Sequence, residues 1–287
     1  MQSEGSQFPA YLSPLLIEQQ VAAALAEDIG SGDLTAELIS GEEVVEATIL
    51  CRDSATLCGI PWAKAAFYQC HASIEQQWWV ADGESVAGAS ELARLRGPAG
   101  ALLTAERTAL NFMQLLSGVA SLTRRFVEQA HRVNPAVDIL DTRKTIPGLR
   151  LAQKYAVLCG GGKNHRIGLY DAILIKENHI AAAGSIAAAI TRAQQRYPEV
   201  LIEIEVETLQ ELQQALDSGC QRILLDNMSP ELIAEAVAIT AGAAELEVSG
   251  GVTLQQLPAI AALGVRYISV GAITKQVEPV DLSMRLN

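Results

Sequence analysis

Two carboxylates in the second half of this 287-residue sequence stand at a spacing that suits chemistry inside a protein. Glu203 and Glu205 are two residues apart in the run Leu201–Val206, so in a strand both side chains point to one side. Carboxylates that point inward need cationic or metal partners. An edge strand with one solvated face is the alternative interpretation. We interpret the pair as acids that point into an internal site.

Cations that could partner these acids gather in one short segment. Between Arg143 and Lys176 lie seven Lys or Arg residues and one acid, so this segment carries +6 in a chain whose net charge is −12. Such a concentration in an acidic protein indicates a local anion site. A solvated helix face is the alternative, but the cations are spread over predicted loops and strand ends. They are Arg143, Lys144, Arg150, Lys154, Lys163, Arg166 and Lys176.

The elements that must position these groups begin near residue 137. From there, short β-branched runs alternate with helical stretches, a pattern that builds a parallel sheet. Six such runs, against the eight of a complete barrel, predict an open and incomplete α/β barrel. The runs are Val137–Asp141, Ala172–Lys176, Leu201–Val206, Arg222–Asp226, Glu245–Ser249 and Tyr267–Gly271.

Helix signals frame this pattern. Thr208 with Glu211, and Thr253 with Gln256, predict capping boxes at two helix starts. Upstream, Thr104 is predicted to cap a long helix in which Gly118 could mark a break. Before that, a helix that starts at Ser13-Pro14 and extended stretches near 45–58 and 76–96 predict a smaller α/β unit.

The carboxyl ends of the six runs are where an α/β barrel holds its active site. Each end carries a charged residue, or a Ser or Gly that can present main-chain N–H groups. Glycine also lets the main chain approach an anion, and late strand loops are the usual phosphate site. The end residues are Asp141 with Thr142, Arg143 and Lys144; Lys176; Glu205; Asp226; Ser249 with Gly250 and Gly251; and Gly271.

Composition excludes several classes of protein. The net charge of −12 argues against nonspecific binding of nucleic acid, which needs a basic face. Five cysteines without a CxxC pair indicate a reducing compartment, and we expect a cytoplasmic location. No signal peptide and no apolar run long enough to span a membrane is visible.

Several longer motifs run through the chain. They are Glu106–Asn111, Asp141–Thr145 with Pro147–Arg150, Gly160–Arg166, Ile175–His179, Leu225–Asn227 and Ser249–Gly251, with Gly32–Thr35 before them. Together these motifs resemble those of the quinolinate phosphoribosyltransferase family, the nicotinate-nucleotide pyrophosphorylases (carboxylating). The resemblance runs from about residue 12 to 275, in order and at the right spacing.

The resemblance implies a fold and an assembly. We expect an N-terminal α/β sandwich domain over residues 1–112, joined by the C-terminal segment 275–287, followed by an open α/β barrel over 113–274. It also implies a homodimer with shared active sites, or a hexamer built from such dimers.

The resemblance further implies that quinolinate and 5-phosphoribosyl-1-pyrophosphate give nicotinate mononucleotide, pyrophosphate and carbon dioxide, with Mg²⁺, in NAD biosynthesis. The catalytic residues would be Lys144, Lys176, Glu205 and Asp226, and the last two would hold the ribose or Mg²⁺, directly or through water. Arg107, Arg143, His165 and Arg166 would hold the carboxylates of quinolinate. Phosphate and further substrate contacts would come from Thr142, Ser249, Gly250, Gly251, Val270, Gly271 and Ala272, beside Lys144 and Lys176.

Two other functions stay open on the sequence. One is a paralogous pyrophosphorylase that acts on another heteroaromatic acid. The other is a non-catalytic binding protein of the same fold. The intact charges at Lys176, Glu205 and Asp226 favour an enzyme, because binding alone need not keep each of them.

Overall fold

The computed structural model describes residues 8–39 and 43–287, which form two compact units. The first unit takes in the chain up to Leu122 together with 147–161 and 276–287. The second unit comprises 123–146 and 162–275. The predicted domain 1–112 includes residues 1–7 and 40–42, which lie outside the described residues.

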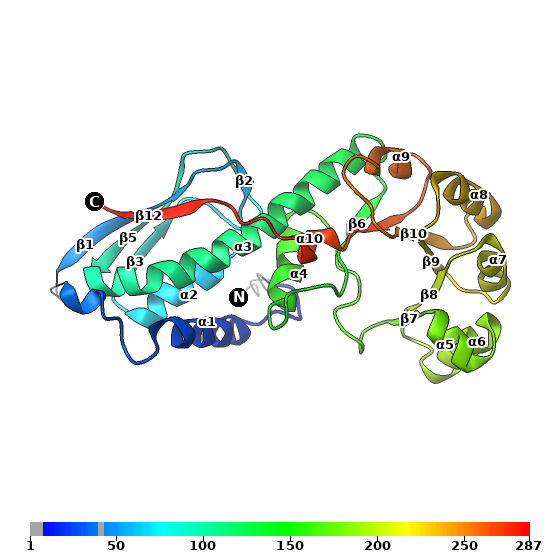
Figure 1. Cartoon of the computed structure of the whole chain (residues 1–287), viewed down its shortest axis with the longest axis horizontal. Helices are drawn as coiled ribbons and strands as arrows, with labels where there is room; N and C mark the ends of the chain where they lie inside the picture. The colour runs from blue at the N-terminus through cyan, green and yellow to red at the C-terminus, as the bar shows by residue number, and fades with distance from the viewer. Residues whose placement is uncertain (1–7, 40–42) are drawn as a thin grey trace, which may run out of the picture. The chain divides into compact units, whose positions relative to one another are not determined.

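An antiparallel sheet organises the first unit. Its strands stand in the order β12 (Leu282–Leu286), β1 (Val44–Cys51), β5 (Ser90–Pro98) and β3 (Glu75–Trp78). The short strands β2 (Ala55–Thr56) and β4 (Ser85–Val86) pair separately. Figure 1 shows β12, the last element of the chain, beside β1. The C-terminal residues therefore complete a sheet that starts near the N-terminus.

Helices accompany this sheet. They are α1 (Pro14–Ile29), the 3₁₀ turn η1 (Ala36–Leu38), α2 (Ile60–Cys70), α4 (Arg150–Cys159) and the first two-thirds of α3 (Ala99–His131). As predicted, Ser13 caps α1, because its side chain accepts a hydrogen bond from the N–H of Leu16, and Pro14 opens the helix. Trp62 and Phe67 on α2 are fully buried in the core of this unit.

Helix α3 differs from the prediction in two ways. It runs unbroken through Gly118, where an added Cβ would lie 2.3 Å from the carbonyl oxygen of Glu278. This glycine therefore serves close packing rather than a break. The helix also starts at Ala99, so Thr104 is internal and donates to the side chain of Asp33 at 2.8 Å. The predicted cap at Thr104 was wrong.

The bounds of the units also differ from the predicted domain bounds. Because α3 is continuous, the first unit extends to Leu122 instead of ending at residue 112. Helix α4, predicted as part of the barrel, belongs to the first unit. Its Tyr155 donates to Asp82 at 3.0 Å and packs on the ring of Trp62.

A six-stranded parallel sheet forms the second unit. The order is β6 (Asp138–Leu140), β11 (Tyr267–Ser269), β10 (Glu245–Ser249), β9 (Arg222–Asp226), β8 (Ile202–Val206) and β7 (Ile173–Ile175). All five neighbouring pairs are parallel. The two end strands β6 and β7 pair with one neighbour each, so among the described residues the sheet stays open. This confirms the predicted open α/β barrel.

Helices line the outer side of this sheet (Figure 1). They are α5 (Glu177–Ala183), α6 (Ile186–Arg196), α7 (Leu209–Asp217), α8 (Pro230–Thr240) and α9 (Leu257–Ala261). The short helix α10 (Ala272–Lys275) follows β11 along the chain. The predicted capping box at Thr208 and Glu211 is present at the start of α7. At α9 the bonds between Thr253 and Gln256 form, but they close the turn before a helix that begins at Leu257.

None of the helices in the described part of the chain combines the length and the apolar character that a membrane crossing requires.

Candidate active site

A pocket of about 170 Å³ lies at the carboxyl ends of the strands of the second unit. Four cations and two carboxylates contribute to its wall, which suits a substrate with several negative charges. This is the edge of the sheet at which the sequence predicts the site. The wall consists of Thr142, Arg143, Lys144, His165, Arg166, Leu174, Lys176, Glu205, Leu224, Glu247, Ser249 and Ser269.

The seven cations of the basic segment do not all reach this pocket. Arg143, Lys144, Arg166 and Lys176 line it. Lys163 is committed elsewhere, because it pairs with Asp138 at 2.8 Å. The remaining two, Arg150 and Lys154, lie on α4 in the first unit, where Lys154 is fully buried. The predicted anion site is therefore built from four of the seven.

Two guanidinium groups line the pocket, and one of them has a buried donor without a partner among the described residues. The Nε of Arg143 is buried and has no hydrogen-bond partner within the described residues. Burial, together with the nearby charge of Arg143, lowers the pKa of Arg166. Two like charges at close range are unfavourable until an anion lies against them. Guanidinium groups match planar carboxylates through paired hydrogen bonds, so this part of the pocket fits a carboxylate ligand.

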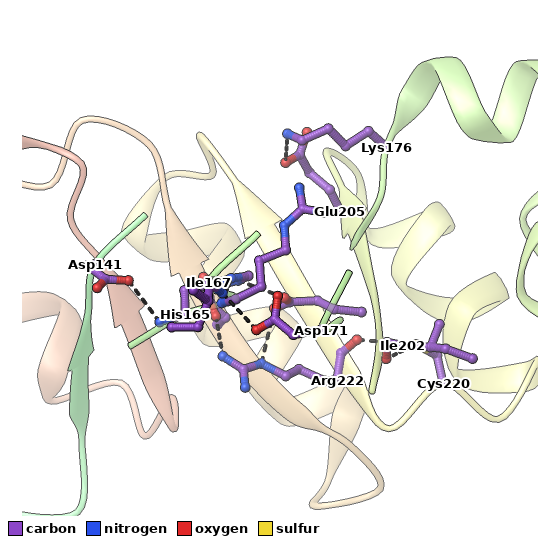
Figure 2. Close-up of polar contacts among 12 residues, drawn as sticks. Asp141, His165, Ile167, Asp171, Lys176, Ile202, Glu205, Cys220 and Arg222 are labelled. Carbon is purple, nitrogen blue, oxygen red and sulfur yellow. Dashed lines mark hydrogen bonds and ion pairs between the residues drawn. The ribbon is translucent and has the colours of Figure 1, made fainter. Parts of the chain in front are cut away.

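Lys176 and Glu205 form an ion pair across neighbouring strands. The Nζ of Lys176, directly after β7, donates to Oε2 of Glu205 on β8, and the two side chains point toward one another in Figure 2. The main-chain N–H of Lys176 donates to the ring of His179, which fixes the turn into α5. The carboxylate of Glu205 is thus held near a cation, as the sequence predicts.

Asp226 lies farther along the sheet than expected. We expected Glu205 and Asp226 at equivalent ends of consecutive strands, but Glu205 pairs in register with Leu224. Asp226 therefore stands two residues beyond Glu205, on the same face, and pairs with Ser249 of β10. Its carboxylate accepts a hydrogen bond from the side chain of Asn227 at 2.8 Å. It does not belong to the pocket wall.

In the loops after β10 and β11, two glycines lie so close to neighbouring side chains that an added Cβ would crowd them. Gly250 has a φ of 108°, and an added Cβ would lie 2.2 Å from Oδ1 of Asn227. Gly271 lies under the side chain of Lys144, whose Cδ would be 3.1 Å from an added Cβ. Thr274 holds Lys144 from the other side by donating to its carbonyl at 2.9 Å. Larger residues at either glycine would displace groups of the site.

A buried ionic network lies at the base of the pocket. Nε2 of His165 is 2.8 Å from Oε2 of Glu203 and 3.5 Å from Oε1 of Glu247. Arg222 donates from Nε to Glu203 at 3.2 Å and from Nη2 to Glu247 at 2.6 Å. Figure 2 shows His165 on its loop and Arg222 on β9 lying close together. The side chains of the two acids are 2% and 0% exposed, so a charge on either acid depends on its contacts with Arg222 and His165.

The network shifts the pKa of its members. Burial and the charge of Glu203 raise the pKa of Glu247 to about 7. Burial also raises the pKa of Glu203, but the hydrogen bond and charge of His165 and the charge of Arg222 outweigh it, so the net shift is downward. For His165, burial lowers the pKa, and the bond to Glu203 and the charge of Glu247 reverse this to a net increase.

A hydrogen bond to Nδ1 of His165 opposes this increase in its pKa. Its Nδ1 accepts the main-chain N–H of Arg166 at 2.8 Å, which requires an unprotonated Nδ1. The carboxylates favour a charged ring, whereas this contact favours the neutral ring with its proton on Nε2. We give the contact more weight, because a second ring proton would point directly at the N–H of Arg166. Both ring nitrogens are therefore engaged.

Two groups of metal-ligating side chains occur among the described residues, and neither reads as a metal centre. Glu203, Glu247 and His165 lie close together, but the guanidinium of Arg222 already binds both acids. Cys58, Asp82 and Cys159 of the first unit also converge. There Asp82 already accepts bonds from the N–H of Ile60 and the hydroxyl of Tyr155, so its carboxylate serves the fold.

A larger hollow of about 550 Å³ lies in the first unit. Its wall combines apolar residues of α1 and α3 with the acids Glu27 and Asp28, and it contains no cation. It does not suit the anionic substrate that the charges of the second unit indicate. We therefore place the chemistry at the smaller, charged pocket.

The remaining predicted residues are placed as follows. Arg107 lies on α3 in the first unit, with its side chain 56% exposed and 3.5 Å from Glu106. Gly250, Gly251, Val270, Gly271 and Ala272 follow β10 and β11 but are not part of the pocket wall. Arg222 and Glu247 were not among the site residues predicted from the sequence. Glu245 and Glu247 show the same two-residue alternation as Glu203 and Glu205, and this signal could have found the second acid.

Comparison with known families gives the same picture as this geometry. The model described as "Quinolinate phosphoribosyl transferase, N-terminal domain" matches residues 33–117, and the corresponding C-terminal domain matches residues 119–285. The chain belongs to this family. As in other quinolinate phosphoribosyltransferases, an N-terminal antiparallel-sheet unit is combined with a parallel α/β unit.

Individual relatives are similar over nearly their whole length. The probable nicotinate-nucleotide pyrophosphorylase (carboxylating) of Bacillus subtilis is 42% identical, over 90% of this chain and 89% of its own. A mitochondrial quinolinate phosphoribosyltransferase (decarboxylating) of Nicotiana tabacum is 38% identical, over 94% and 82%. The solved nicotinate-nucleotide pyrophosphorylase of Francisella tularensis superposes with a TM-score of 0.93 at 44% identity, over 96% and 98%.

Proposed function

We propose that the cationic pocket of the second unit holds quinolinate by its carboxylates, beside the pyrophosphate of the second substrate. The protein is a quinolinate phosphoribosyltransferase, a nicotinate-nucleotide pyrophosphorylase (carboxylating) of NAD biosynthesis. It joins quinolinate to 5-phosphoribosyl-1-pyrophosphate and yields nicotinate mononucleotide, pyrophosphate and carbon dioxide. The family membership carries this activity, and the proposals concern which residues perform it.

The carboxylates of quinolinate are assigned to Arg143 and Arg166. The observation that carries this assignment is the buried, unpartnered Nε of Arg143 next to a second guanidinium in the same pocket. A dianion would neutralise both charges and satisfy the donor. His165 borders the same pocket, but both of its ring nitrogens are engaged, so we give the direct contacts to the two arginines.

The phosphates are assigned to lysines and to main-chain N–H groups. Lys144 lies over Gly271, and Lys176 projects from the end of β7, so each presents an ammonium group at the pocket. Ser249, Gly250 and Gly251 follow β10, where a loop can cradle the 5′-phosphate. Thr142 holds the N–H of Lys144 at 3.0 Å, and Val270 and Ala272 flank Gly271, so these residues shape the same loops.

Glu205 and Asp226 are assigned to the ribose and to Mg²⁺. Carboxylate oxygens are the donors that Mg²⁺ prefers, and Mg²⁺ keeps several waters. Glu205 and Asp226 lie on one face of adjacent strands, and Glu205 is already paired with Lys176. This arrangement fits an Mg²⁺ ion that is held through its waters. The ion would neutralise charge on the departing pyrophosphate. Glu205 and Asp226 would hold the ribose hydroxyls, and they would stabilise the positive charge that develops on the sugar.

The charges of the pocket suit each stage of the reaction. As the bond between ribose carbon and pyrophosphate oxygen breaks, the lysines stabilise the leaving anion. The ring nitrogen of quinolinate forms the new bond to carbon and becomes positive. Carbon dioxide then leaves, its electron pair stays on the ring carbon beside the positive nitrogen, and a proton from solvent takes the place of the lost carboxylate. Arg143 and Arg166 hold the ring in place by its carboxylates during bond formation.

Assembly and location extend the proposal. We propose a homodimer, alone or within a hexamer, in which Arg107 of one subunit completes the site of the other. Its exposed side chain on α3, paired within the described residues with neighbouring Glu106, leaves it available for such a contact. We further propose a cytoplasmic location. The cysteines that the structure describes are all free thiols, which fits a reducing compartment.

Calorimetry with two related ligands tests the carboxylate assignment. Quinolinate carries two adjacent carboxylates and nicotinate carries one. If Arg143 and Arg166 act together on a dianion, quinolinate binds well over tenfold more tightly than nicotinate in the absence of the sugar pyrophosphate. Equal affinities for quinolinate and nicotinate would show that the pocket binds only one carboxylate, and would overturn this part of the proposal.

A further inference from the structure

The side chain of His165 is held from both ends. On one side Nε2 meets Glu203 at 2.8 Å, and on the other Nδ1 accepts the main-chain N–H of Arg166 at 2.8 Å. The ring thus bridges a buried acid and the main chain of a residue whose side chain lines the pocket. Its side chain is 10% exposed, so neither contact is weakened by competition from bulk water.

Three further residues hold the acid side of this bridge. Both carboxylate oxygens of Glu203 have a partner. Arg222 donates to Oε1, and Nε2 of His165 lies next to Oε2. The same guanidinium binds Glu247 at 2.6 Å and stacks over the ring of Tyr267 at 4.0 Å. Strands β8, β9, β10 and β11 each contribute one member. The four strands therefore place His165 from the rigid part of the sheet.

We propose that Glu203, Arg222 and Glu247 are positioning residues that act through His165 to fix the main chain at Arg166. This inference rests on the proposed function, because Arg166 is assigned to a carboxylate of quinolinate. It changes the expected role of His165, from a direct ligand of the substrate to the link between a buried network and a substrate-binding arginine. The network on the strands holds the loop before β7 in place. In this position the guanidinium groups of Arg143 and Arg166 can bind the same dianion.

A metal ion is the alternative occupant of this network, since His165, Glu203 and Glu247 have suitable ligand types. The bonds of Arg222 to both acids argue against it, because a cation already stands where the two carboxylates converge. Oε1 of Glu247 is buried without a hydrogen-bond partner among the described residues, but the other carboxylate oxygens of the network are held by Arg222 and His165, so the network serves geometry rather than ligation.

Two replacements of His165 separate a positioning role from a direct one. Asparagine can place an acceptor near the position of Nδ1, so His165→Asn keeps the contact to the N–H of Arg166 and loses Glu203. Glutamine can place a donor near the position of Nε2, so His165→Gln keeps Glu203 and loses Arg166. The proposal predicts that His165→Asn binds quinolinate about fivefold more tightly than His165→Gln. The reverse order, or equal affinities, would show that the contact of Nδ1 with the N–H of Arg166 does not support quinolinate binding, and would overturn the proposal.

A double-mutant cycle tests the link to the network. Glu203→Gln can accept a bond from only one of its two donors, so it loosens the ring and lowers quinolinate affinity by about fivefold. On a His165→Ala background the same change should cost nothing further, because the link is already gone. Additive losses in the cycle would show that Glu203 acts by another route. Thermal melting of each variant identifies one that fails to fold, and the His165 pair decides the question in that case.

The tautomer of His165 gives a readout that does not depend on activity. Nitrogen-15 NMR of the wild-type protein above neutral pH should show the proton on Nε2 and a bare Nδ1, and His165→Asn should leave the other three histidines unchanged. A proton on Nδ1 would contradict the bridge. Failure of the proposed function looks different, because the wild-type protein would then bind no quinolinate while the tautomer stayed as described.

Discussion

Glu205 and Asp226 face the same side of adjacent parallel strands, but Asp226 stands two residues farther along, because Glu205 pairs with Leu224. Two residues of strand span about 6.6 Å, and adjacent strands lie about 4.8 Å apart. The carboxylates therefore meet a substrate at two depths rather than side by side. Glu205 lies next to Lys176 in the pocket, and Asp226 lies next to the loop after β10.

Loss of either acid should damage the transition state more than the ground state. We expect Glu205→Gln and Asp226→Asn to lower kcat and kcat/KM together by roughly 100- to 1000-fold, with little change in KM. Quinolinate binding without the sugar pyrophosphate should stay nearly unchanged, because the acids would repel the dianion. Steady-state kinetics and calorimetry check this. Glu235→Gln, exposed on α8, is the control. Near-normal kcat in both variants would leave the acids as structural residues.

Loss of either guanidinium should weaken quinolinate binding. Arg143→Ala and Arg166→Ala should each reduce affinity well over tenfold, and wild-type affinity should fall as salt rises. Lys163→Ala is a matched control, because Lys163 belongs to the same basic segment but pairs with Asp138, which keeps Arg266 at 2.7 Å. Calorimetry across a salt series gives both results. Equal binding in all three variants would disconnect the pocket from quinolinate.

Local sequence patterns predicted the barrel because the alternation of residues in the strands and the signals for helix starts agree in this part of the sequence. The alternation at Glu203 and Glu205 located a strand and its inward face, and Thr208 with Glu211 located the next helix start. At Gly118 the local pattern indicated a helix break that does not occur. The glycine is required for close packing against the main chain of Glu278, and this tertiary contact cannot be predicted from the local sequence. Lys154 misled for the same reason, since its charge is buried in the other unit.

Register was also beyond the reach of the sequence. Strand ends can be read from composition, but the offset between β8 and β9 depends on how their side chains pack between helices and sheet. The two-residue offset of Asp226 is the consequence. Arg222 was missed for a related reason, because a cation at the start of a strand gains meaning only when the register brings it opposite Glu203 and Glu247.

Stability should depend on pH through Glu247. Its pKa is raised to about 7, so the folded protein keeps a proton that the unfolded chain releases near pH 4.5. This contribution is fully present below pH 4.5, falls as pH rises to 7 and is flat above, with a total of about 3 kcal/mol.

Glu247→Gln should remove this slope. Urea unfolding of the wild-type protein and the variant between pH 4.5 and 8 measures it as the difference in unfolding free energy. Glu203, His165 and Arg222 face Glu247 from β8, the loop before β7 and β9, so the difference measures Glu247 together with its effect on these neighbours. A pH-independent difference would mean that Glu247 titrates normally in the folded protein.

Shared sites should allow complementation between inactive subunits. We expect Arg107→Ala and Lys176→Ala each to abolish most activity, and a mixture of the two to recover part of it. One site in each mixed dimer would then combine an intact Arg107 with an intact Lys176. Activity after mixing, with exchange verified by mass spectrometry of differently tagged subunits, checks this. Verified exchange without recovery would place Arg107 and Lys176 in the site of the same subunit.

The decisive measurement is carbon dioxide release from quinolinate, with and without 5-phosphoribosyl-1-pyrophosphate, in the presence of Mg²⁺. Decarboxylation needs the positive ring that forms only when the ring nitrogen joins the ribose. We therefore expect release that requires both substrates and matches nicotinate mononucleotide and pyrophosphate one for one. Release without the sugar pyrophosphate would contradict the order of bond changes, and no release with both substrates would contradict the activity itself.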